Sequence, residues 1–212
     1  MVESPVRRQY GQVMPYDEMK AITQFCGDRG IGTHLDAARL YMMTTATGVT
    51  AQAYTDLFDT VYVSLYKYFG APFGAILAGD SQLIDGMFHT RRMFGGGLAS
   101  AFFAAALALQ GIEGFSVRFE EALLKARELF QRLSSLPDIE IKEFDHGSNI
   151  FPIKFASGVD LDRLIEALHQ RDVFVYPDEA TGTISSLTVN TTLLRQSNEA
   201  IFQAFRLALN AS

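Results

Sequence analysis

The hydrophobic and polar positions of the first third of the chain predict an alternation of strands and helices. Residues 59–67, DTVYVSLYK, are β-branched and aromatic almost throughout. A run without clean alternation is typical of a strand buried on both faces, such as a central parallel strand. Before it, the pattern predicts a helix over 16–30, a short strand over 31–36 and a partly helical crossover over 37–58. This order implies parallel βαβ units.

The middle of the chain continues this rhythm. We expect a strand over 74–79 and a helix over 80–94, after which three glycines at 95–97 lead into LASAFFAAALAL at 98–109. This last stretch is the most apolar of the chain and predicts a helix buried in a core. It is too short to cross a bilayer, which takes roughly 20 residues.

The pattern changes near Gly114, where a long amphipathic helix is predicted over 115–136. The mixture that follows is typical of a smaller α+β domain with antiparallel strands. We therefore expect two domains, 1–114 and 115–212. The strands and helices predicted in the second domain are strands at 139–144, 149–155, 173–177 and 185–190 and helices at 160–172 and 198–210.

Composition narrows the class of protein. The 212 residues are 48% hydrophobic and 20% charged, which is ordinary for a globular chain, and the net charge is −6. Without a basic cluster, a nucleic-acid partner is not expected. The start has no signal-peptide core, and no metal-ligand cluster is visible. The single cysteine, Cys26, fits a reducing compartment, so we expect a cytoplasmic protein without a membrane partner.

Two ionisable residues are placed where a parallel sheet binds ligands, at the carboxyl ends of strands. Asp36 ends the strand at 31–36, and Lys67 ends the run at 59–67. A lysine in a dry pocket can be neutral enough to form a Schiff base, and an opposing carboxylate suits a protonated ring nitrogen. Pyridoxal 5'-phosphate requires this pair from its protein. The alternative is that Lys67 extends to solvent and Asp36 caps the next helix.

Three segments resemble motifs of the threonine aldolase and β-eliminating lyase family. THLDAARLY is similar to its HLDGARL, SLYKYFGAPFGAILAG to its SLSKGLGAPVGSVLAG, and RRMFGGGLASA to its RKxLGGGMRQAG. The resemblance implies an α/β fold of type I among pyridoxal-phosphate enzymes, with a mostly parallel sheet and a small α+β C-terminal domain. It also implies a lyase that cleaves the Cα–Cβ bond of a β-hydroxy-α-amino acid, giving glycine and an aldehyde.

The resemblance also implies roles for single residues. Lys67 is carried over as the catalytic lysine that forms the imine with the cofactor, and Asp36 as the partner of the ring nitrogen. Arg39 corresponds to a group that faces the substrate carboxylate, a task suited to a planar guanidinium. Arg92, next to Arg91, matches basic positions near the cofactor phosphate, often reaching it from a neighbouring subunit; the alternative is a solvated arginine pair.

Two further features stay open. His34 lies two residues before Asp36, so both side chains share one face of a strand. His34 therefore either lines the cofactor pocket or is a hydrogen-bonded core histidine. The glycines at 95–97 precede a helix, so they form either an anion site or a flexible helix start.

Departures from the family pattern keep other functions open. Tyr66 stands where the family has Ser before the lysine, and Tyr68 and Phe69 replace Gly-Leu. Ala99-Ser100 replaces an Arg-Gln that helps to hold the phosphate, and 185–187 lacks an arginine that grips the substrate carboxylate. The alternatives are a β-eliminating lyase or decarboxylase acting on another amino acid, and an incomplete, non-catalytic scaffold.

The family comparison predicts two more properties of the whole protein. Family members carry more than a hundred residues before the segment that matches the start of this chain, so we expect 1–114 to be the C-terminal part of the cofactor-binding domain. Family members are usually dimers or tetramers with active sites between subunits, so we expect a homo-oligomer.

Overall fold

The computed structural model describes residues 1–177 and 182–210. The chain forms two compact units, Met1–Val117 and Arg118–Ser212, each treated below by itself. The division falls within the long helix near the boundary expected at residue 114. The assignment of the first unit as part of a cofactor-binding domain stays a prediction.

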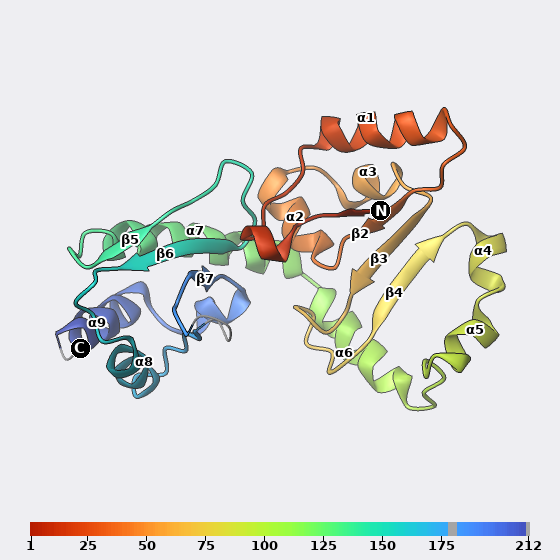
Figure 1. The fold of residues 1–212 in the computed structure, drawn as a ribbon. Helices are drawn as coiled ribbons and strands as arrows, with labels where there is room; N and C mark the ends of the chain where they lie inside the picture. The colour runs from red at the N-terminus through yellow and green to blue at the C-terminus, as the bar shows by residue number, and fades with distance from the viewer. Residues whose placement is uncertain (178–181, 211–212) are drawn as a thin grey trace. The chain divides into compact units, whose positions relative to one another are not determined.

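The first unit is built on a four-stranded sheet with the order β1-β2-β3-β4 (Figure 1). Its strands are β1 (Val2–Glu3), β2 (His34–Asp36), β3 (Thr60–Ser64) and β4 (Ala75–Gly79). The first three are parallel. The pairing of β2 with β3 confirms the βαβ unit predicted over 31–67, whereas β1 was not predicted and β4 runs antiparallel to β3, against the predicted parallel rhythm. The turn at 65–74 contains no helix, and a parallel crossover needs a longer connection that usually contains one.

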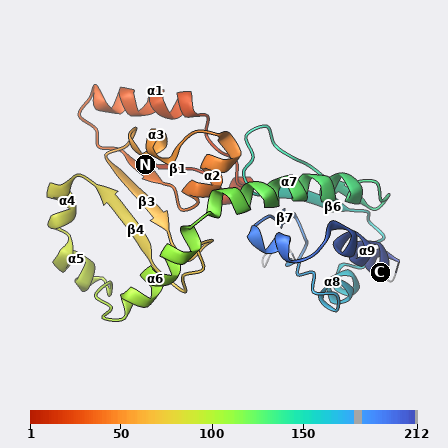
Figure 2. The same ribbon diagram turned by 180° about the vertical axis from the view of Figure 1, so that it is seen from behind.

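Helices of the first unit follow the predicted order (Figures 1 and 2). The predicted helix at 80–94 is split into α4 (Ser81–Asp85) and α5 (Phe88–Met93) near Gly86, because glycine weakens a helix interior. The other predicted helices form, although most are shorter than expected. The helical segments are η1 (Arg7–Gln9), α1 (Tyr16–Gly27), α2 (Leu40–Thr47), α3 (Ala51–Thr55), α4 (Ser81–Asp85), α5 (Phe88–Met93) and α6 (Ala101–Ile112).

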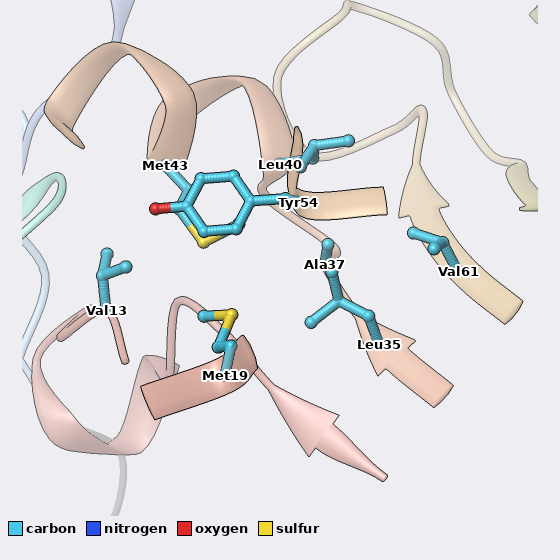
Figure 3. Packing of buried hydrophobic residues seen from close by; sticks show 8 residues of the cluster. All are labelled: Val13, Met19, Leu35, Ala37, Leu40, Met43, Tyr54 and Val61. Carbon is cyan, nitrogen blue, oxygen red and sulfur yellow. The ribbon is translucent and has the colours of Figure 1, made fainter. Parts of the chain in front are cut away.

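The core of this unit lies on one face of the sheet (Figure 3). Leu35 of β2 and Val61 of β3 are register partners and point to the same face. They pack with residues of α1, α2 and α3, including Met19, Met43 and Tyr54, all of which are almost completely buried. Burying each large apolar side chain contributes about 1.5–3 kcal/mol, so this cluster is the main stabilising element of the sheet.

The prediction that 98–109 is a buried helix is wrong in part, because α6 forms but most of its large side chains are exposed. Phe102, Phe103 and Leu109 are between 62 and 71% exposed, whereas Ala104 and Ala108 are buried. The small side chains and Gly111 share the packed face. A Cβ at Gly111 would lie 1.8 Å from the Phe69 carbonyl oxygen, so only glycine permits this close approach.

The described residues contain no single helix that is long and apolar enough to cross a membrane. Helix α6 and the following helix α7 (Phe115–Leu133) meet the criteria of length and hydropathy only when taken together as a bent pair.

The second unit contains a three-stranded antiparallel sheet with the order β5-β6-β7. Asp160 and Ser197 cap the amino ends of α8 and α9 through their side chains, which confirms the helix start predicted at Asp160. The elements are β5 (Ile139–Ile141), β6 (Ile150–Phe155), α8 (Leu161–His169), β7 (Ser186–Thr188), η2 (Thr191–Arg195) and α9 (Asn198–Leu209), with most of α7.

The strand predicted at 173–177 is wrong, because this segment has no strand pairing. Asp172 adopts a left-handed conformation with φ 58°, and the Val173 amide donates back to the Leu168 carbonyl. The backbone amide that would begin a strand therefore closes the end of α8 instead.

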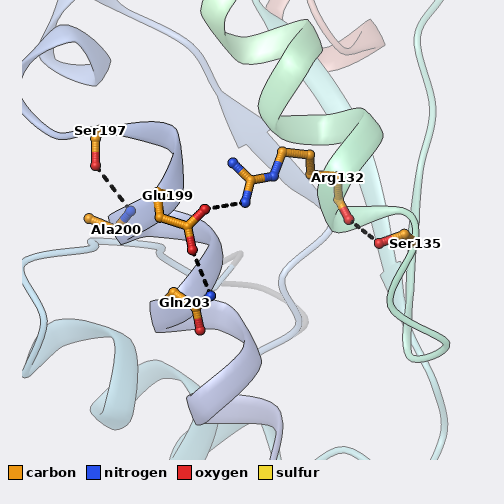
Figure 4. Close-up of polar contacts among 6 residues, drawn as sticks. All are labelled: Arg132, Ser135, Ser197, Glu199, Ala200 and Gln203. Atoms are coloured by element: carbon orange, nitrogen blue, oxygen red, sulfur yellow. Dashed lines mark hydrogen bonds and ion pairs between the residues drawn. The ribbon is translucent and has the colours of Figure 1, made fainter.

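Polar contacts join α7 to α9 in the second unit (Figure 4). Arg132 of α7 donates to the Glu199 carboxylate, and Gln203 donates to the other Glu199 oxygen at 2.7 Å. These hydrogen bonds, Arg132 first, lower the pKa of Glu199. This network lies on the surface and holds secondary structure together.

Candidate active site

The predicted site residues Asp36 and Lys67 follow neighbouring parallel strands. Asp36 is the last residue of β2, and β3 ends at Ser64, three residues before Lys67. Because β2 and β3 are parallel and directly paired, their carboxyl ends meet at one edge of the sheet. The fold therefore brings these two segments together as the sequence predicts.

Strand register defines an open face at this edge. Asp36 pairs with Tyr62, and His34 pairs with Thr60, so these four side chains share one face of the sheet. This face is opposite to the one that carries Leu35 into the core. All four residues are half-buried. The open face thus offers polar groups on a rigid floor whose other side is packed.

Asp36 is a candidate both as a cap for the helix that follows and as a partner of the cofactor ring, and its surroundings are compatible with parts of both roles. Its Oδ1 accepts a hydrogen bond from the Ala38 amide at 3.1 Å, so the carboxylate does stabilise the turn that follows β2. Helix α2, however, begins later, with Arg39 at its N-cap. No hydrogen bond to the second oxygen, Oδ2, is found in the described parts of the chain. Asp36 is therefore held in orientation by one oxygen, and the other is available to a ligand.

His34 is held by a side-chain hydrogen bond. Its Nδ1 lies 2.8 Å from the Thr60 hydroxyl oxygen. The ring is half-buried on the same face as Asp36, so it faces the candidate site and is hydrogen-bonded at the same time. The two alternatives left open by the sequence are compatible in this geometry.

Lys67 lies in the turn after β3, and the expectation of a lysine in a dry pocket is wrong for this structure. Its side chain is exposed, and Nζ lies 5.7 Å from the centre of the Tyr66 ring. The strand itself is only partly buried, because its second face is the open one. Lys67 therefore has an accessible amine on a turn whose position is set by its neighbours.

Aromatic residues fix this turn. Phe69 is 2% exposed, and its ring lies 4.3 Å from Tyr68, 5.2 Å from Tyr41 and 5.2 Å from Phe115. Burial raises the pKa of Tyr68 well above its ordinary value. The family has Gly-Leu at Tyr68 and Phe69, so this chain has filled the same turn with large rings. The departure changes the packing beneath Lys67 without removing the lysine.

Arg39 is a half-buried guanidinium at the same edge. Burial lowers its pKa, and the positive charge of Arg7 acts in the same direction. No hydrogen bond from its side chain and no ion pair within 4.0 Å is found in the described residues. A half-buried arginine without an acidic partner in the described residues is suited to bind an anion from outside the chain.

The fold does not bring Arg92 into contact with the other candidate site residues. It lies on α5 with its guanidinium 5.7 Å from the centre of the Phe88 ring. Neither an ion pair nor a hydrogen bond joins it to Asp36 among residues 1–177 and 182–210. Its role at a cofactor phosphate stays a prediction.

The glycines at 95–97 have a role that the sequence did not reveal. Gly95 has φ 82° and donates to the Arg92 carbonyl, while Gly96 donates to the Arg91 carbonyl. These two bonds form a helix C-terminal cap of α5. A Cβ on Gly96 would lie 2.6 Å from the Arg91 side chain. The segment therefore ends one helix rather than beginning the next, since α6 starts only at Ala101.

Sequence reasoning missed Tyr62, which adjoins Asp36 on the open face. Burial raises the pKa of Tyr62, and the nearby Tyr66 phenol and Asp36 carboxylate act in the same direction. The spacing of Thr60, Tyr62 and Ser64 at every second position would have identified this face, had β3 been read as covered on one side only.

The arrangement fits the ring and aldehyde end of pyridoxal phosphate. An accessible amine and a carboxylate follow adjoining strands. Within the described ranges, one oxygen of that carboxylate accepts no hydrogen bond, and the half-buried Arg39 has no acidic partner. The sheet edge thus has the chemical groups that this cofactor and an amino acid carboxylate require.

Comparison with known proteins agrees with this geometry. The sequence model described as beta-eliminating lyase matches residues 1–155. The chain belongs to the beta-eliminating lyase family. Pyridoxal phosphate, which the motifs predicted, is the cofactor of this family.

Relatives within the family carry different names. The chain is 36% identical over 104 residues to a low-specificity L-threonine aldolase of Candida albicans, covering 49% of this chain and 28% of that protein. It is 34% identical over 127 residues to the alanine racemase TOXG of Cochliobolus carbonum, covering 58% of this chain and 33% of that protein. The alignments therefore span about a third of the length of these curated relatives.

A solved structure shows the same fold. A protein of Exiguobacterium sp. 255-15, assigned as an aromatic amino acid β-eliminating lyase/threonine aldolase, is 26% identical with a TM-score of 0.79. The match covers 99% of this chain and 61% of that one. The predicted α/β fold of type I is confirmed.

Proposed function

We propose that the protein is a pyridoxal-phosphate-dependent lyase that cleaves the Cα–Cβ bond of a β-hydroxy-α-amino acid, releasing glycine and an aldehyde. The main support is the pairing of β2 with β3, which puts Asp36 and the Lys67 turn at one edge of the sheet. Family membership and the threonine aldolase relatives support the reaction class.

Each candidate residue has a distinct task in this proposal. Lys67 would hold the cofactor covalently through its amine, and Asp36 would keep the ring nitrogen protonated through its charge. His34 would line the ring. When bound, pyridoxal phosphate supplies an electron-accepting ring that stabilises the charge left on the substrate α-carbon.

The substrate and the phosphate need other groups. Arg39 would bind the α-carboxylate, because its half-buried guanidinium has no acid partner in the described residues. Arg92 would approach the cofactor phosphate from α5, together with ligands outside the site described above. The absence of the family's Arg-Gln at Ala99-Ser100 makes such ligands necessary.

Labelling of Lys67 tests the cofactor assignment. The protein is mixed with pyridoxal phosphate, reduced with borohydride and digested, and the pyridoxyl group is located by mass spectrometry. We expect the label on Lys67 and none in Lys67→Ala, which should have no turnover. Lys20→Ala, at an exposed position of α1, is the matched control and should keep both the label and the activity. An active Lys67→Ala variant would rule out the proposed role.

A second reaction on the same cofactor is favoured by one observation. The alanine racemase relative shows that the fold is used for chemistry other than aldol cleavage. β-Elimination, the reaction that gives the family its name, or decarboxylation of another amino acid is the alternative. Release of glycine, ammonia or carbon dioxide from a panel of amino acids distinguishes these reactions. If the unreduced, cofactor-loaded protein releases none of these products and does not interconvert amino acid enantiomers, the non-catalytic alternative holds.

Two properties of the whole protein remain proposals. A homo-oligomer is supported by the exposed apolar side chains of α6, since such surfaces are usually covered by another protein surface. Sedimentation of the protein at several concentrations measures this state. A cytoplasmic location is supported by the free thiol of Cys26.

A further inference from the structure

We propose that Arg7 is a second substrate-positioning residue, which together with Arg39 forms the site for the α-carboxylate of the amino acid substrate. This inference deepens the proposed function and rests on it for the identity of the carboxylate. The argument begins with the topology of the sheet edge.

Two segments bring Arg7 and Arg39 to the same edge. Arg7 begins η1, which closely follows the end of β1, and Arg39 precedes α2, shortly after the end of β2. Strands β1 and β2 are parallel, with Glu3 paired to Asp36. The Ser4 amide donates to the Asp36 carbonyl at 3.0 Å, so the two strand ends are tied together. Both arginines therefore lie at the carboxyl edge that also carries Asp36.

The charged groups that act on Arg39 do not balance one another. Arg7 repels Arg39 strongly enough to lower the pKa of Arg39, second only to burial, whereas Glu3 acts in the opposite direction and less strongly. Tyr66 and Tyr68, the remaining neighbours, are phenols and carry no charge near neutral pH. Among the described residues, Arg7 is the cation and Glu3 the carboxylate that act on Arg39, and the effect of Arg7 is the larger.

Neither arginine has an ion pair in the described residues, and their side chains make no hydrogen bond there. Holding a half-buried guanidinium beside another cation without an acid partner is unfavourable, unless an external anion completes the site. A carboxylate bridging two guanidinium groups would satisfy both charges with paired, charge-assisted hydrogen bonds. The amino acid carboxylate is the anion that the proposed reaction supplies.

The neighbouring residue Arg8 provides a matched control. It has the same charge, is exposed like Arg7 and lies in the same η1 turn, but it is not among the groups that interact electrostatically with Arg39. A general effect of surface charge would appear equally in Arg7 and Arg8 variants. A carboxylate site would distinguish them.

The first measurement uses the cofactor-loaded protein and two small probes. Glycine and methylamine, which lacks the carboxylate, are titrated and followed by the cofactor absorbance. We expect Arg7→Gln to weaken glycine binding by roughly 10- to 100-fold, the range for a hydrogen bond to a charged group, and to leave methylamine unchanged. Arg7→Lys should recover part of the loss, and Arg8→Gln should stay within about twofold of the parent. An equal loss for both probes, or unchanged glycine binding, would overturn the proposal.

The second measurement needs no cofactor. Acetate should raise the thermal unfolding midpoint of the cofactor-free protein by binding to the folded state. Arg7→Gln and Arg39→Gln should lose this rise, and Arg8→Gln should keep it. An acetate effect that is the same in all three variants would contradict the paired site. If Lys67 fails to label while the acetate effect depends on Arg7, the lyase proposal fails and the carboxylate site stands.

Discussion

The two faces of the sheet in the first unit differ sharply, although the same strands build both. On β2, Leu35 is completely buried under α1, α2 and α3, whereas His34 and Asp36 on either side of it are half-buried on the open face. The covered face contains apolar side chains, and the open face contains an imidazole, a carboxylate and a phenol. Alternate residues of one strand therefore separate the packed core from the candidate site, so we expect that each can be changed without the other.

Leu35→Ala is expected to have the largest effect on stability, because it leaves a cavity in the covered face. Truncation of a fully buried leucine costs about 2–5 kcal/mol. Urea unfolding of the variant measures this loss. Asp36→Asn, one residue along, keeps the acceptor for the Ala38 amide and should change stability by less than about 1 kcal/mol. Equal losses in the two variants would show that the faces are not independent.

Gly111→Ala tests the close contact between α6 and the turn that carries Lys67. In a helix, alanine is normally favoured over glycine by about 0.5–1 kcal/mol. Here the added methyl would meet the Phe69 backbone, and overpacking typically costs about 1–3 kcal/mol, so we expect net destabilisation. The turn that carries Lys67 should shift as well, which would reduce pyridoxyl labelling of Lys67.

The control for this change is Gly32→Ala, where a Cβ would meet nothing within 4 Å. We expect its unfolding midpoint in urea to match the parent closely. A Gly111→Ala variant as stable as Gly32→Ala would mean that α6 does not approach the lysine turn as closely as the structure shows.

Substitution of Asp59 tests the amino edge of the same strands, which is opposite to the candidate site. We expect it to change the stability of the protein the least. Its carboxylate accepts hydrogen bonds from the Thr33 amide at 2.6 Å and the Thr33 hydroxyl at 2.8 Å, and these bonds lower its pKa. A depressed folded-state pKa stabilises the protein above the unfolded value of about 3.9, and this stabilisation is lost as the pH falls toward the folded-state value.

Acid titration of stability measures this contribution. We expect Asp59→Asn to show a smaller loss of stability than the parent as the pH falls from about 5 to about 3. Asp56→Asn, an exposed aspartate at the end of α3, should follow the parent. Parallel curves for Asp59→Asn and the parent would show that the Thr33 contacts do not persist in solution.

Local sequence patterns were reliable where one residue type controls the backbone. Asp160 begins α8 as predicted, because its side chain accepts the Arg163 amide. They failed at helix ends, where the last turn of a helix determines the conformation of the residues that follow it. The glycines at 95–97 cap the end of α5, and Val173 closes α8 instead of starting a strand. Both outcomes depend on which carbonyl each amide reaches, which the order of residues alone does not specify.

The sequence by itself determined the family and the parallel order of β2 and β3, and it singled out Asp36 and Lys67 as candidates, because strand ends and motifs are local properties of the chain. Only the tertiary structure decided that Tyr62 adjoins Asp36, that Lys67 is exposed on an aromatic turn and that Arg7 lies near Arg39. Side chains from separate strands become neighbours through register and packing, and the resulting balance of burial and charge exists only in the folded chain.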